Sequence, residues 1–426
     1  PLREAGAYNH IFFDPVAGAE EYRIYKVRNG VGGFIGYSKV SPFKDDNIDA
    51  DMTVTPPVAS TYFDGVGKYP SVVSMFQQRL VLAASNREPE TIWMSRAGDY
   101  FNFTRSRIIS ATDRAEFNIS GEELNRIRGL LQLRELLVFT SSGEWSVTGP
   151  DGGFSALNPI VTRYGYVGSG KVKPLVSDDT ALFVDRTGQR VRDLRYAYES
   201  DGYSGNDLTI FASHFFMGRR IVSWAMAKNP FSLIWVALDN GKLLSLTYNR
   251  EHQVWGWTEH EMSGRVESVA CVPEGGSDAT YIIVARNIGG QVRRYVERFD
   301  DRDFTTAEDA FFVDCGITYQ GGATTTITGL SHIENQSVVA LADGNVIEGL
   351  TVTSGSVTLP QPASKVHVGL PFTAMFENLP PAIQFDDVGS SRGRPHSVSA
   401  VRIQMERTRG IKIATQDGRT NEIIQT

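Results

Sequence analysis

The sequence predicts an all-β fold: a β-propeller of five or six blades, with small β-sandwich or barrel accessory domains. The main observation is a pattern that recurs five times between Val72 and Arg298. Each repeat has an apolar strand, a polar break, a strongly apolar strand, a glycine-containing turn and a more polar return strand. The repeats lie 45 to 55 residues apart, and short strands with a period of roughly 40–50 residues are typical of propeller blades. The 41 glycines suit many tight turns, and helix signals are scarce.

The strands of the five repeats can be placed along the chain. The leading strands are expected to begin near Val72, Ile127, Lys173, Ile221 and Val266. The central strands are expected at residues 80–84, 136–140, 181–184, 233–238 and 281–285. The fourth repeat is the clearest, because Asn240-Gly241 is a type I′ hairpin signal. Its four strands are expected at residues 221–227, 233–238, 242–248 and 254–260, which make a complete blade.

The fourth repeat also contains four of the six tryptophans, Trp224, Trp235, Trp255 and Trp257. Large aromatic side chains in such strands usually pack one blade against the next. We therefore expect them in the core, and sugar binding by these rings is the alternative.

Composition changes along the chain predict four regions. Residues 1–57 form a small β unit that ends at Pro56-Pro57, and residues 58–304 form the propeller body. Residues 305–372, rich in Thr, Val and Gly, form a small β-sandwich or barrel. Residues 373–426 hold C-terminal strands that close the propeller or join a platform. Segment 16–25 resembles the second-strand region of fibronectin type III domains, which implies an adaptor or spacer role for the first unit.

Further elements are expected outside the repeats. In the N-terminal unit strands are expected at 11–13, 22–27 and 34–37. Within the propeller body a short helix is expected at 121–128. Toward the C-terminus strands are expected at 324–328, 337–341, 346–352, 356–359, 372–376 and 398–405. Residues 401–405 and 411–414 are candidates for closing the propeller.

The charge and the cysteines limit the function classes. The net charge is −7, and the pI is about 5.6, whereas a protein that grips DNA phosphates normally has a basic excess. Weak acidity suits a surface past which DNA slides without sticking, or simply a soluble surface. No apolar run is long enough to span a membrane, and no signal peptide is visible. Cys271 and Cys315 are expected to be buried free thiols. The chain begins with Pro1, so it is expected to be a piece of a longer protein.

One segment has the spacing of a phosphate-binding loop. Residues 165–171 read Gly-Tyr-Val-Gly-Ser-Gly-Lys, but Val172 stands where a Ser or Thr would hold magnesium. Pro174 follows where the helix should run, so the amides that cradle phosphate would be missing. A loop between blades is the favoured interpretation, and no cofactor is expected.

Metal sites are not expected either. The seven histidines, His10, His214, His252, His260, His332, His367 and His396, show no zinc-site spacing. His252 and His260 could meet across a hairpin, but no nearby cysteine completes a set. The acidic loop with Asp45, Asp46, Asp49 and Asp51 lacks the register of a calcium loop, so a solvated loop is favoured over adventitious calcium.

Enzyme chemistry is not expected, and no catalytic residue is assigned. Propeller glycosidases need a pair of carboxylates at the channel mouth. Residues 141–145, Ser-Ser-Gly-Glu-Trp, lack the Asp and the spacing of a sialidase turn. No Gly-x-Ser-x-Gly nucleophile elbow is present. Acidic residues that leave a carboxylate pair open are Glu116, Asp193, Asp201 and Asp207.

Several stretches together resemble one family, the tail proteins of double-stranded DNA bacteriophages, and are similar to the tail nozzle (tail tubular protein B) of short-tailed phages. The resemblance covers roughly residues 70–300. It is carried by residues 78–81, 91–95, 98–103, 143–145, 191–194, 201–203, 206–209, 247–251, 254–257 and 295–298. In this family the motifs are specific in combination and weak singly.

The resemblance implies a virion structural protein of the phage tail, made in the bacterial host cytoplasm. It implies a homo-oligomeric ring, usually a hexamer, that contacts portal, adaptor and other tail proteins. Double-stranded DNA would pass through its lumen without sequence-specific binding. Loops 105–114 and 186–195 could dock neighbours by charge complementarity, or be plain solvated loops. The alternatives are a tail-tip or fibre module that binds a glycan and, in third place, a glycan-degrading enzyme.

Overall fold

The structure is a computed structural model. It describes residues 6–28, 31–54, 56, 62–106, 109–121, 123–198, 201–301, 304–378, 384–385, 389–390, 402–404, 411–414 and 420–422. The chain divides into two compact units: residues 1–70 with 85–88, and residues 71–84 with 89–426. Nearly all regular elements of both units are strands, so the chain is all-β.

The first unit contains two small antiparallel sheets. Strand β2 (Tyr22–Arg28) pairs with β3 (Val31–Ser38), and β1 (Asn9–Ile11) pairs with β4 (Phe43–Asp45). The strands predicted at 22–27 and 34–37 lie within β2 and β3. The strand predicted at 11–13 lies two residues earlier. Ile24 and Ile35 are the buried apolar side chains of this unit.

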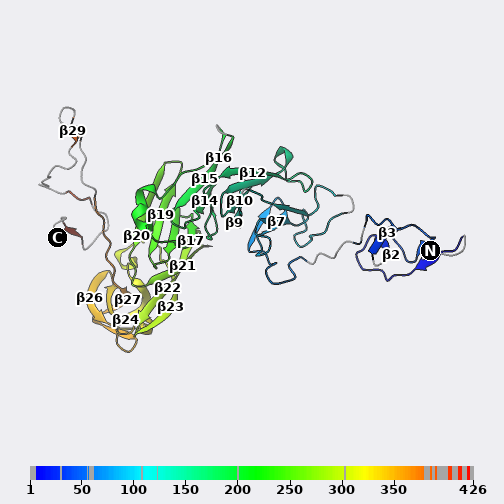
Figure 1. Cartoon of the computed structure of the whole chain (residues 1–426). Coiled ribbons are helices and arrows are strands. Elements are labelled where there is room, and N and C mark those ends of the chain that lie inside the picture. The colour runs from blue at the N-terminus through cyan, green and yellow to red at the C-terminus, as the bar shows by residue number, and fades with distance from the viewer. Residues whose placement is uncertain are drawn as a thin grey trace. The chain divides into compact units, whose positions relative to one another are not determined.

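The second unit begins with four successive antiparallel sheets of four strands each, and each sheet is a meander in chain order (Figure 1). The first has β5 (Val72–Phe76), β6 (Arg79–Ala83), β7 (Thr91–Met94) and β8 (Ala115–Asn118). The second has β9 (Ile127–Gln132), β10 (Leu136–Thr140), β11 (Glu144–Thr148) and β12 (Ile160–Gly165). The third has β13 (Leu175–Ser177), β14 (Thr180–Val184), β15 (Val191–Ala197) and β16 (Gly202–Ser204). The fourth has β17 (Ile221–Ala227), β18 (Leu233–Leu238), β19 (Leu243–Asn249) and β20 (Val254–His260).

A fifth sheet follows the same plan with three strands, β21 (Arg265–Glu274), β22 (Ser277–Ile288) and β23 (Gln291–Arg298). The predicted leading strands begin within two residues of β5, β9, β13, β17 and β21. Four-stranded meanders repeated along the chain are blades, which confirms the propeller-type fold.

The hydrophobic cores lie between neighbouring blades. One core contains side chains from the first and second sheets, a second joins the second sheet to the third, a third joins the third to the fourth, and a fourth joins the fourth to the fifth. Alternation explains this, because successive side chains of a strand point to opposite faces. In β10, for example, Val138 enters the first of these cores and Phe139 enters the second.

The tryptophans of the fourth sheet follow the core expectation with one exception. Trp224 and Trp235 are buried, and Trp257 packs partly buried against Phe216. Trp224 Nε1 donates a hydrogen bond to the carbonyl oxygen of Lys173 at 2.6 Å, which ties the fourth sheet to the chain entering the third. Trp255 is 41% exposed, so its packing role was predicted wrongly.

A separate four-stranded sheet follows the fifth sheet in the second unit. It contains β24 (Asp314–Thr328), β25 (Ser337–Ala342), β26 (Asn345–Thr351) and β27 (Ser356–Leu370), in the order β24-β27-β25-β26. The ladder between β24 and β27 shifts register three times, and such irregularities bend strands. The sheet encloses a core of its own, made by residues of all four strands and their connections.

Short elements complete the structure. They are η1 (Pro150–Gly152), η3 (Ile210–Ala212), α1 (Ser213–Phe216), η4 (Ala307–Asp309), η5 (Ser331–Ile333), β28 (Gln384–Phe385), β29 (Gly389–Ser390), β30 (Lys412–Ala414) and β31 (Thr420–Glu422). Over the described part of the chain, no helix is long and apolar enough to cross a membrane.

Three of the expected elements differ from the structure. The helix predicted at 121–128 is wrong, because the described residues there are irregular until β9 begins at Ile127. The strand predicted at 372–376 is also wrong, because these residues belong to no regular element and pair with no described strand. Of the strand predicted at 398–405, residues 402–404 are irregular, and the remainder lies outside the described residues.

A buried histidine links the last sheet to η4 and predicts a pH dependence. His367 Nδ1 lies 2.8 Å from Thr318 Oγ1, and Nε2 lies 3.0 Å from the carbonyl oxygen of Glu308. Because a carbonyl only accepts, Nε2 carries the proton and Nδ1 accepts from the hydroxyl. Burial lowers the pKa of His367, and the nearby charge of Lys365 acts in the same direction.

The unfolded chain therefore takes up this proton first, near the ordinary histidine pKa of about 6.5. The contribution of His367 to the free energy of unfolding should be constant above that pH and fall as the pH drops below it. Replacing His367 by Gln should reduce this loss between pH 7.5 and pH 5.5, as measured by urea unfolding. An unchanged pH profile in His367→Gln would contradict the assignment, and His252→Gln, in an exposed turn, is the matched control.

Candidate functional site

The glycine-rich segment 165–171 connects the second sheet to the third. It follows β12 and leads to β13, and the described residues between these strands contain no helix. Its glycines are required by packing. A Cβ at Gly165 would lie 2.0 Å from Glu144 Oε2, and Gly168 has φ +75° with the carbonyl oxygen of Ser141 2.4 Å from its would-be Cβ. The interpretation as a loop between blades is confirmed.

Glu144 anchors this loop from below. It is a buried residue of β11, and its Oε1 accepts a hydrogen bond from Gly168 N at 2.9 Å. Burial raises the pKa of Glu144, although the loop amides and the charge of Arg192 act in the opposite direction. A raised carboxyl pKa often marks a catalytic acid. Here, however, the side chain of Glu144 is enclosed by the loop 165–171, to which it is hydrogen-bonded.

Replacing Gly165 by Ala should destabilise the protein by about 1–3 kcal/mol, because the added methyl group overlaps the Glu144 carboxylate. Gly153→Ala is the matched control, because its Cβ would meet nothing within 4 Å and its φ of −93° suits any residue. Urea unfolding of both variants measures the difference. Equal stability of the two variants would show that the Glu144 contact does not constrain Gly165.

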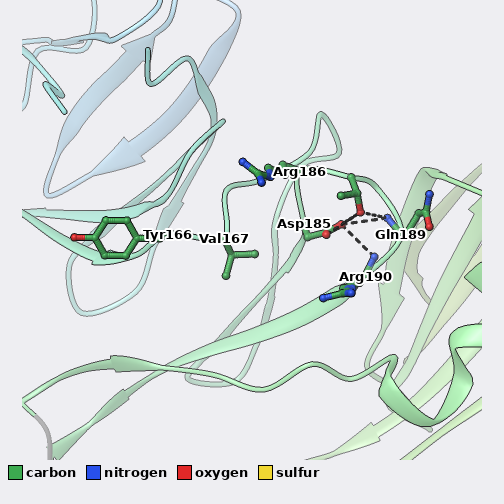
Figure 2. Close-up of a pocket in the computed structure, with 7 residues that line it drawn as sticks. Tyr166, Val167, Asp185, Arg186, Gln189 and Arg190 are labelled. Atoms are coloured by element: carbon green, nitrogen blue, oxygen red, sulfur yellow. Dashed lines mark hydrogen bonds between the residues drawn. The ribbon is translucent and has the colours of Figure 1, made fainter. Parts of the chain in front are cut away.

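An arginine-lined pocket lies beside this loop, with a volume of about 380 Å³ (Figure 2). One wall is Tyr166 and Val167, and the other is the turn that follows β14, from Asp185 to Arg190. Tyr166 is largely exposed, and its ring centroid lies 3.9 Å from the guanidinium carbon of Arg163. The pocket and its rim therefore carry cationic side chains beside an aromatic ring, a chemistry suited to carboxylates or other anions.

The turn that carries these arginines is held from within by Asp185. Its carboxylate accepts hydrogen bonds from Thr187 Oγ1 at 2.8 Å, Gln189 N at 3.1 Å and Arg190 N at 3.2 Å. Arg186 and Arg190 remain on the outside of the turn (Figure 2). The predicted docking loop 186–195 therefore consists of a hydrogen-bonded turn, residues 186–190, and the first residues of β15.

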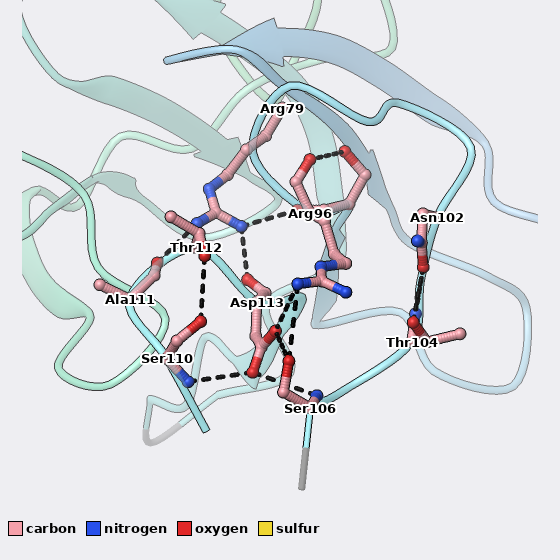
Figure 3. A network of polar contacts seen from close by, with 10 residues as sticks. Arg79, Arg96, Asn102, Thr104, Ser106, Ser110, Ala111, Thr112 and Asp113 are labelled. Carbon is pink, nitrogen blue, oxygen red and sulfur yellow. Dashed lines mark hydrogen bonds and ion pairs between the residues drawn. The ribbon is translucent and has the colours of Figure 1, made fainter. Parts of the chain in front are cut away.

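The second predicted docking loop, 105–114, belongs to a longer excursion between β7 and β8. Its described part is organised by Asp113, whose carboxylate accepts hydrogen bonds from Ser110 N at 2.9 Å, Ser106 N at 3.2 Å and Ser106 Oγ at 2.7 Å (Figure 3). Arg96 lies 3.4 Å from the same carboxylate. Burial alone would raise the pKa of Asp113, but these hydrogen bonds and Arg96 outweigh it, and the pKa is lowered.

Arg79 holds the same excursion to the first sheet. Its guanidinium donates to three carbonyl oxygens, those of Ser95 at 2.7 Å, Ala111 at 2.7 Å and Asp113 at 2.5 Å (Figure 3). Phe101, in the outer part of the excursion, is 90% exposed. A rigidly anchored loop with an exposed aromatic side chain is a suitable element for contact with another protein.

The carboxylates considered for glycoside hydrolysis each have a contact within the fold. Asp193 is buried and binds Arg250 Nη1 at 2.5 Å, and Asp201 accepts from Tyr196 at 2.5 Å. Asp207 accepts from Thr209 N at 2.8 Å, and Glu116 pairs with Arg114 at 2.5 Å. These contacts position loops and strand ends.

His396 lies outside the described residues, and the structure does not bring the other six histidines and the acidic loop together. His252 lies in the turn before β20, and His260 ends that strand beside Ser245, so the two do not meet across the hairpin as considered. Asp45 pairs with Lys26 at 2.9 Å, while Asp51 accepts from Thr53. Within the described ranges, no three His, Cys, Asp or Glu residues are placed to hold a metal. Cys271 and Cys315 are free thiols of intermediate burial, with no disulfide between them.

A larger cavity of about 540 Å³ lies between the fifth sheet and the last sheet. We call it the edge cleft. Its two long walls are residues 295–301 and residues 311–316, and Trp235, His332 and Phe372 also line it. Trp235 stacks on Phe299 with ring centroids 4.7 Å apart. Tyr295 donates its hydroxyl to the carbonyl oxygen of His332 at 3.3 Å.

Sequence reasoning missed the buried charged residues that organise these regions, Arg79, Asp113, Glu144, Arg286 and Asp314. One signal was available for two of them. Arg79 and Arg286 each stand within a strand of apolar residues, where a charge is unexpected unless it is paired. The partners themselves lie 11 to 34 residues away along the chain.

No protein-family model matches the chain, and no curated protein matches it. Similar solved structures include the β-propeller domain of Cps50 (Swd1) from Myceliophteria thermophila, at 9% identity over 54% of this chain and 84% of that one, with a TM-score of 0.28. A protein from Lactobacillus plantarum is 11% identical over 66% and 82%, with a TM-score of 0.32. Hsv2 from Kluyveromyces lactis is 10% identical over 55% and 75%, with a TM-score of 0.30. At these values the similarities carry no argument about function.

Proposed function

We propose that the protein is a structural subunit of a bacteriophage tail, a nozzle-like ring component of the conduit through which DNA leaves the particle. The observation that carries the proposal is the use of its buried charges. Arg79, Asp113, Glu144 and Asp185 all fix loops and turns. These groups make the surface loops rigid, as an assembled particle requires of its subunits.

The partners follow from the same proposal. Copies of the chain form a homo-oligomeric ring, with six as the expected number, which contacts portal, adaptor and other tail proteins. Phe101 and the arginines at 186 and 190 supply the apolar and cationic contacts of the two anchored loops. Double-stranded DNA passes without being gripped, consistent with the net charge of −7. The protein has no enzymatic activity of its own in this proposal.

Glycan binding by a tail-tip or fibre module remains the alternative. It needs Trp or Tyr side chains exposed together in one groove. In the edge cleft, Trp235 is buried against Phe299, and the Tyr295 hydroxyl is bonded to the backbone. These contacts favour the structural role over the glycan-binding role.

Cryo-electron microscopy of the parent virion tests the proposal. We expect density for this fold in a ring on the tail axis, between the portal region and the distal tip. Density away from the axis, for example in a fibre, would replace the nozzle proposal by the alternative. A glycan array probed with the purified chain should show no binding.

A further inference from the structure

We propose that the free edge of β23 binds an extended strand, residues 372–377, from a second copy of this chain. The exchanged strand would complete the fifth blade and connect neighbouring subunits. This inference rests on the proposed ring for the identity of its partner, and it names the contact by which adjacent copies join.

The first observation is that the fifth sheet is one strand short. In the other four sheets the third strand lies between the second and the fourth, whereas no described strand pairs with the outer side of β23. The burial differs accordingly. The third strands β7, β11 and β19 are mostly buried and β15 is mostly buried or half-buried, but β23 is mostly exposed. Val292 and Val296 are 68% and 73% exposed.

The second observation is the direction of the backbone groups. Ile288 pairs with Gln291 across a two-residue turn, and Phe299 N donates to the carbonyl oxygen of Thr280 at 2.9 Å. Alternate residues of an antiparallel pair share hydrogen bonds. Odd-numbered residues of β23 therefore bond to β22. Residues 292, 294, 296 and 298 direct their N–H and C=O groups away from the sheet, toward a missing neighbour.

The third observation is the edge cleft itself. Consecutive residues 295–299 line it, although consecutive side chains of a strand point to opposite faces. The cleft therefore runs along the edge of β23, with residues 311–316 as its far wall. Its volume of about 540 Å³ leaves room for side chains of an added strand. Addition of a strand to an exposed edge is an established mode of protein recognition.

The occupant is argued from charge and from pattern. Strand β23 has three arginines and one glutamate. Arg294 and Arg298 pair with Glu267 and Glu274 of β21, so repulsion between two copies of β23 placed edge to edge would come mainly from Arg293. Residues 372–377 read Phe-Thr-Ala-Met-Phe-Glu. As a strand, this segment would place Phe372, Ala374 and Phe376 on one face and Thr373, Met375 and Glu377 on the other, and it carries only a negative charge. This segment complements the arginine-rich edge.

A second copy is assigned because of where this segment lies. Phe372 lines the edge cleft, but the residues after it do not, and Met375 and Phe376 are 86% and 89% exposed. The segment pairs with no strand among the described residues of its own copy. An exchange between copies gives both the free edge and the free segment a partner.

Cysteine cross-linking tests the exchange in the full chain. Two variants, Val296→Cys and Ala374→Cys, are prepared separately, mixed, and oxidised mildly. We expect a disulfide-linked species of twice the chain mass that contains one copy of each variant. The unsubstituted chain controls for Cys271 and Cys315, and Val222→Cys, an exposed valine on β17, replaces Val296→Cys as the matched control.

The outcomes separate the possibilities. Cross-linking only within a Val296→Cys/Ala374→Cys double variant, without doubled mass, would overturn the proposal in favour of pairing by the chain's own segment. No cross-link in either format would overturn it as well. Light scattering distinguishes this failure from failure of the ring: oligomers without the mixed disulfide reject the strand exchange alone. Virion density off the tail axis, together with the mixed disulfide, rejects the nozzle role alone.

The variant Val296→Pro provides a second measurement. Proline removes the N–H of residue 296, which is not bonded to β22, so the fold tolerates it on an edge strand. We expect the circular dichroism spectrum to be unchanged and the association constant from concentration-dependent light scattering to fall at least about tenfold, which corresponds to about 1.4 kcal/mol. An unchanged association constant with intact folding would count against pairing at this edge.

Discussion

Replacing Arg286 by Met should lower the free energy of unfolding by about 3–5 kcal/mol, because it leaves the buried carboxylate of Asp314 and the partly buried carboxylate of Glu297 without their partner. Arg286 is 1% exposed, and every N–H of its guanidinium group donates a hydrogen bond. It donates to Glu297 at 2.7 Å, to Asp314 at 2.6 and 3.0 Å, and to the carbonyl oxygen of Ser263 at 2.9 Å. Burial alone would lower the pKa of Arg286, but these two carboxylates outweigh it and raise the pKa.

The effect should be concentrated where the fifth sheet meets the last sheet, since Glu297 belongs to β23 and Asp314 begins β24. Urea unfolding followed by tryptophan fluorescence measures it, because Trp235 lines the adjoining edge cleft. Arg294→Met is the matched control. Arg294 pairs with Glu267 on the exposed side of the sheet, and such pairs contribute roughly 0–1 kcal/mol.

A combined variant examines the cause of this loss. If the unpaired carboxylates are responsible, Arg286→Met together with Glu297→Gln and Asp314→Asn should regain part of the lost stability. No recovery in the triple variant would instead assign the loss to packing of the arginine side chain.

Replacing Arg79 by Met should cost at least about 2 kcal/mol, since two buried carbonyl oxygens, those of Ser95 and Asp113, and the partly buried one of Ala111 lose their donor, and each buried group costs about 1–3 kcal/mol. Arg79 is 2% exposed, and its guanidinium carbon lies 5.3 Å from the ring centroid of Phe154, which adds a packing contact. Besides the loss of stability, limited proteolysis should cut the excursion between β7 and β8 faster, because its anchor to the first sheet is gone.

Arg105→Met, in the exposed part of the same excursion, is the control and should change stability by no more than about 0.5 kcal/mol. Arg79→Lys should fall between the two, because an ammonium group has fewer donors and no fork geometry. A proteolysis rate that is unchanged in Arg79→Met would show that the excursion is held by Asp113 alone.

The strands of the blades could be predicted because their signals are local. Alternation of apolar residues and turns such as Asn240-Gly241 lie within a few residues of the strands that they define. The predicted central strand 136–140 coincides with β10, and 233–238 coincides with β18. The prediction of a strand at 372–376 was wrong because strand pairing is not a local property. Its pattern suits a strand, but pairing depends on a neighbour that the sequence does not name.

The candidate site could be predicted only in part. The two loops proposed for docking were singled out from their charges, but their anchors were not, because Arg79 meets residues 16 to 34 positions away and Glu144 meets Gly168. Such contacts arise from the meeting of sheets. The glycines of residues 165–171 illustrate the point: their spacing suggested a phosphate loop, while the close approach of Glu144 explains Gly165.

The sharing of apolar cores by adjacent blades has a consequence for how the molecule unfolds. Each interior blade contributes one face to the core before it and the other face to the core after it. Deleting one repeat would remove side chains from two hydrophobic cores at once, whereas lengthening an outer turn would remove none. Loss of structure should then spread from blade to blade along the chain, as in proteins whose repeats depend on their nearest neighbours.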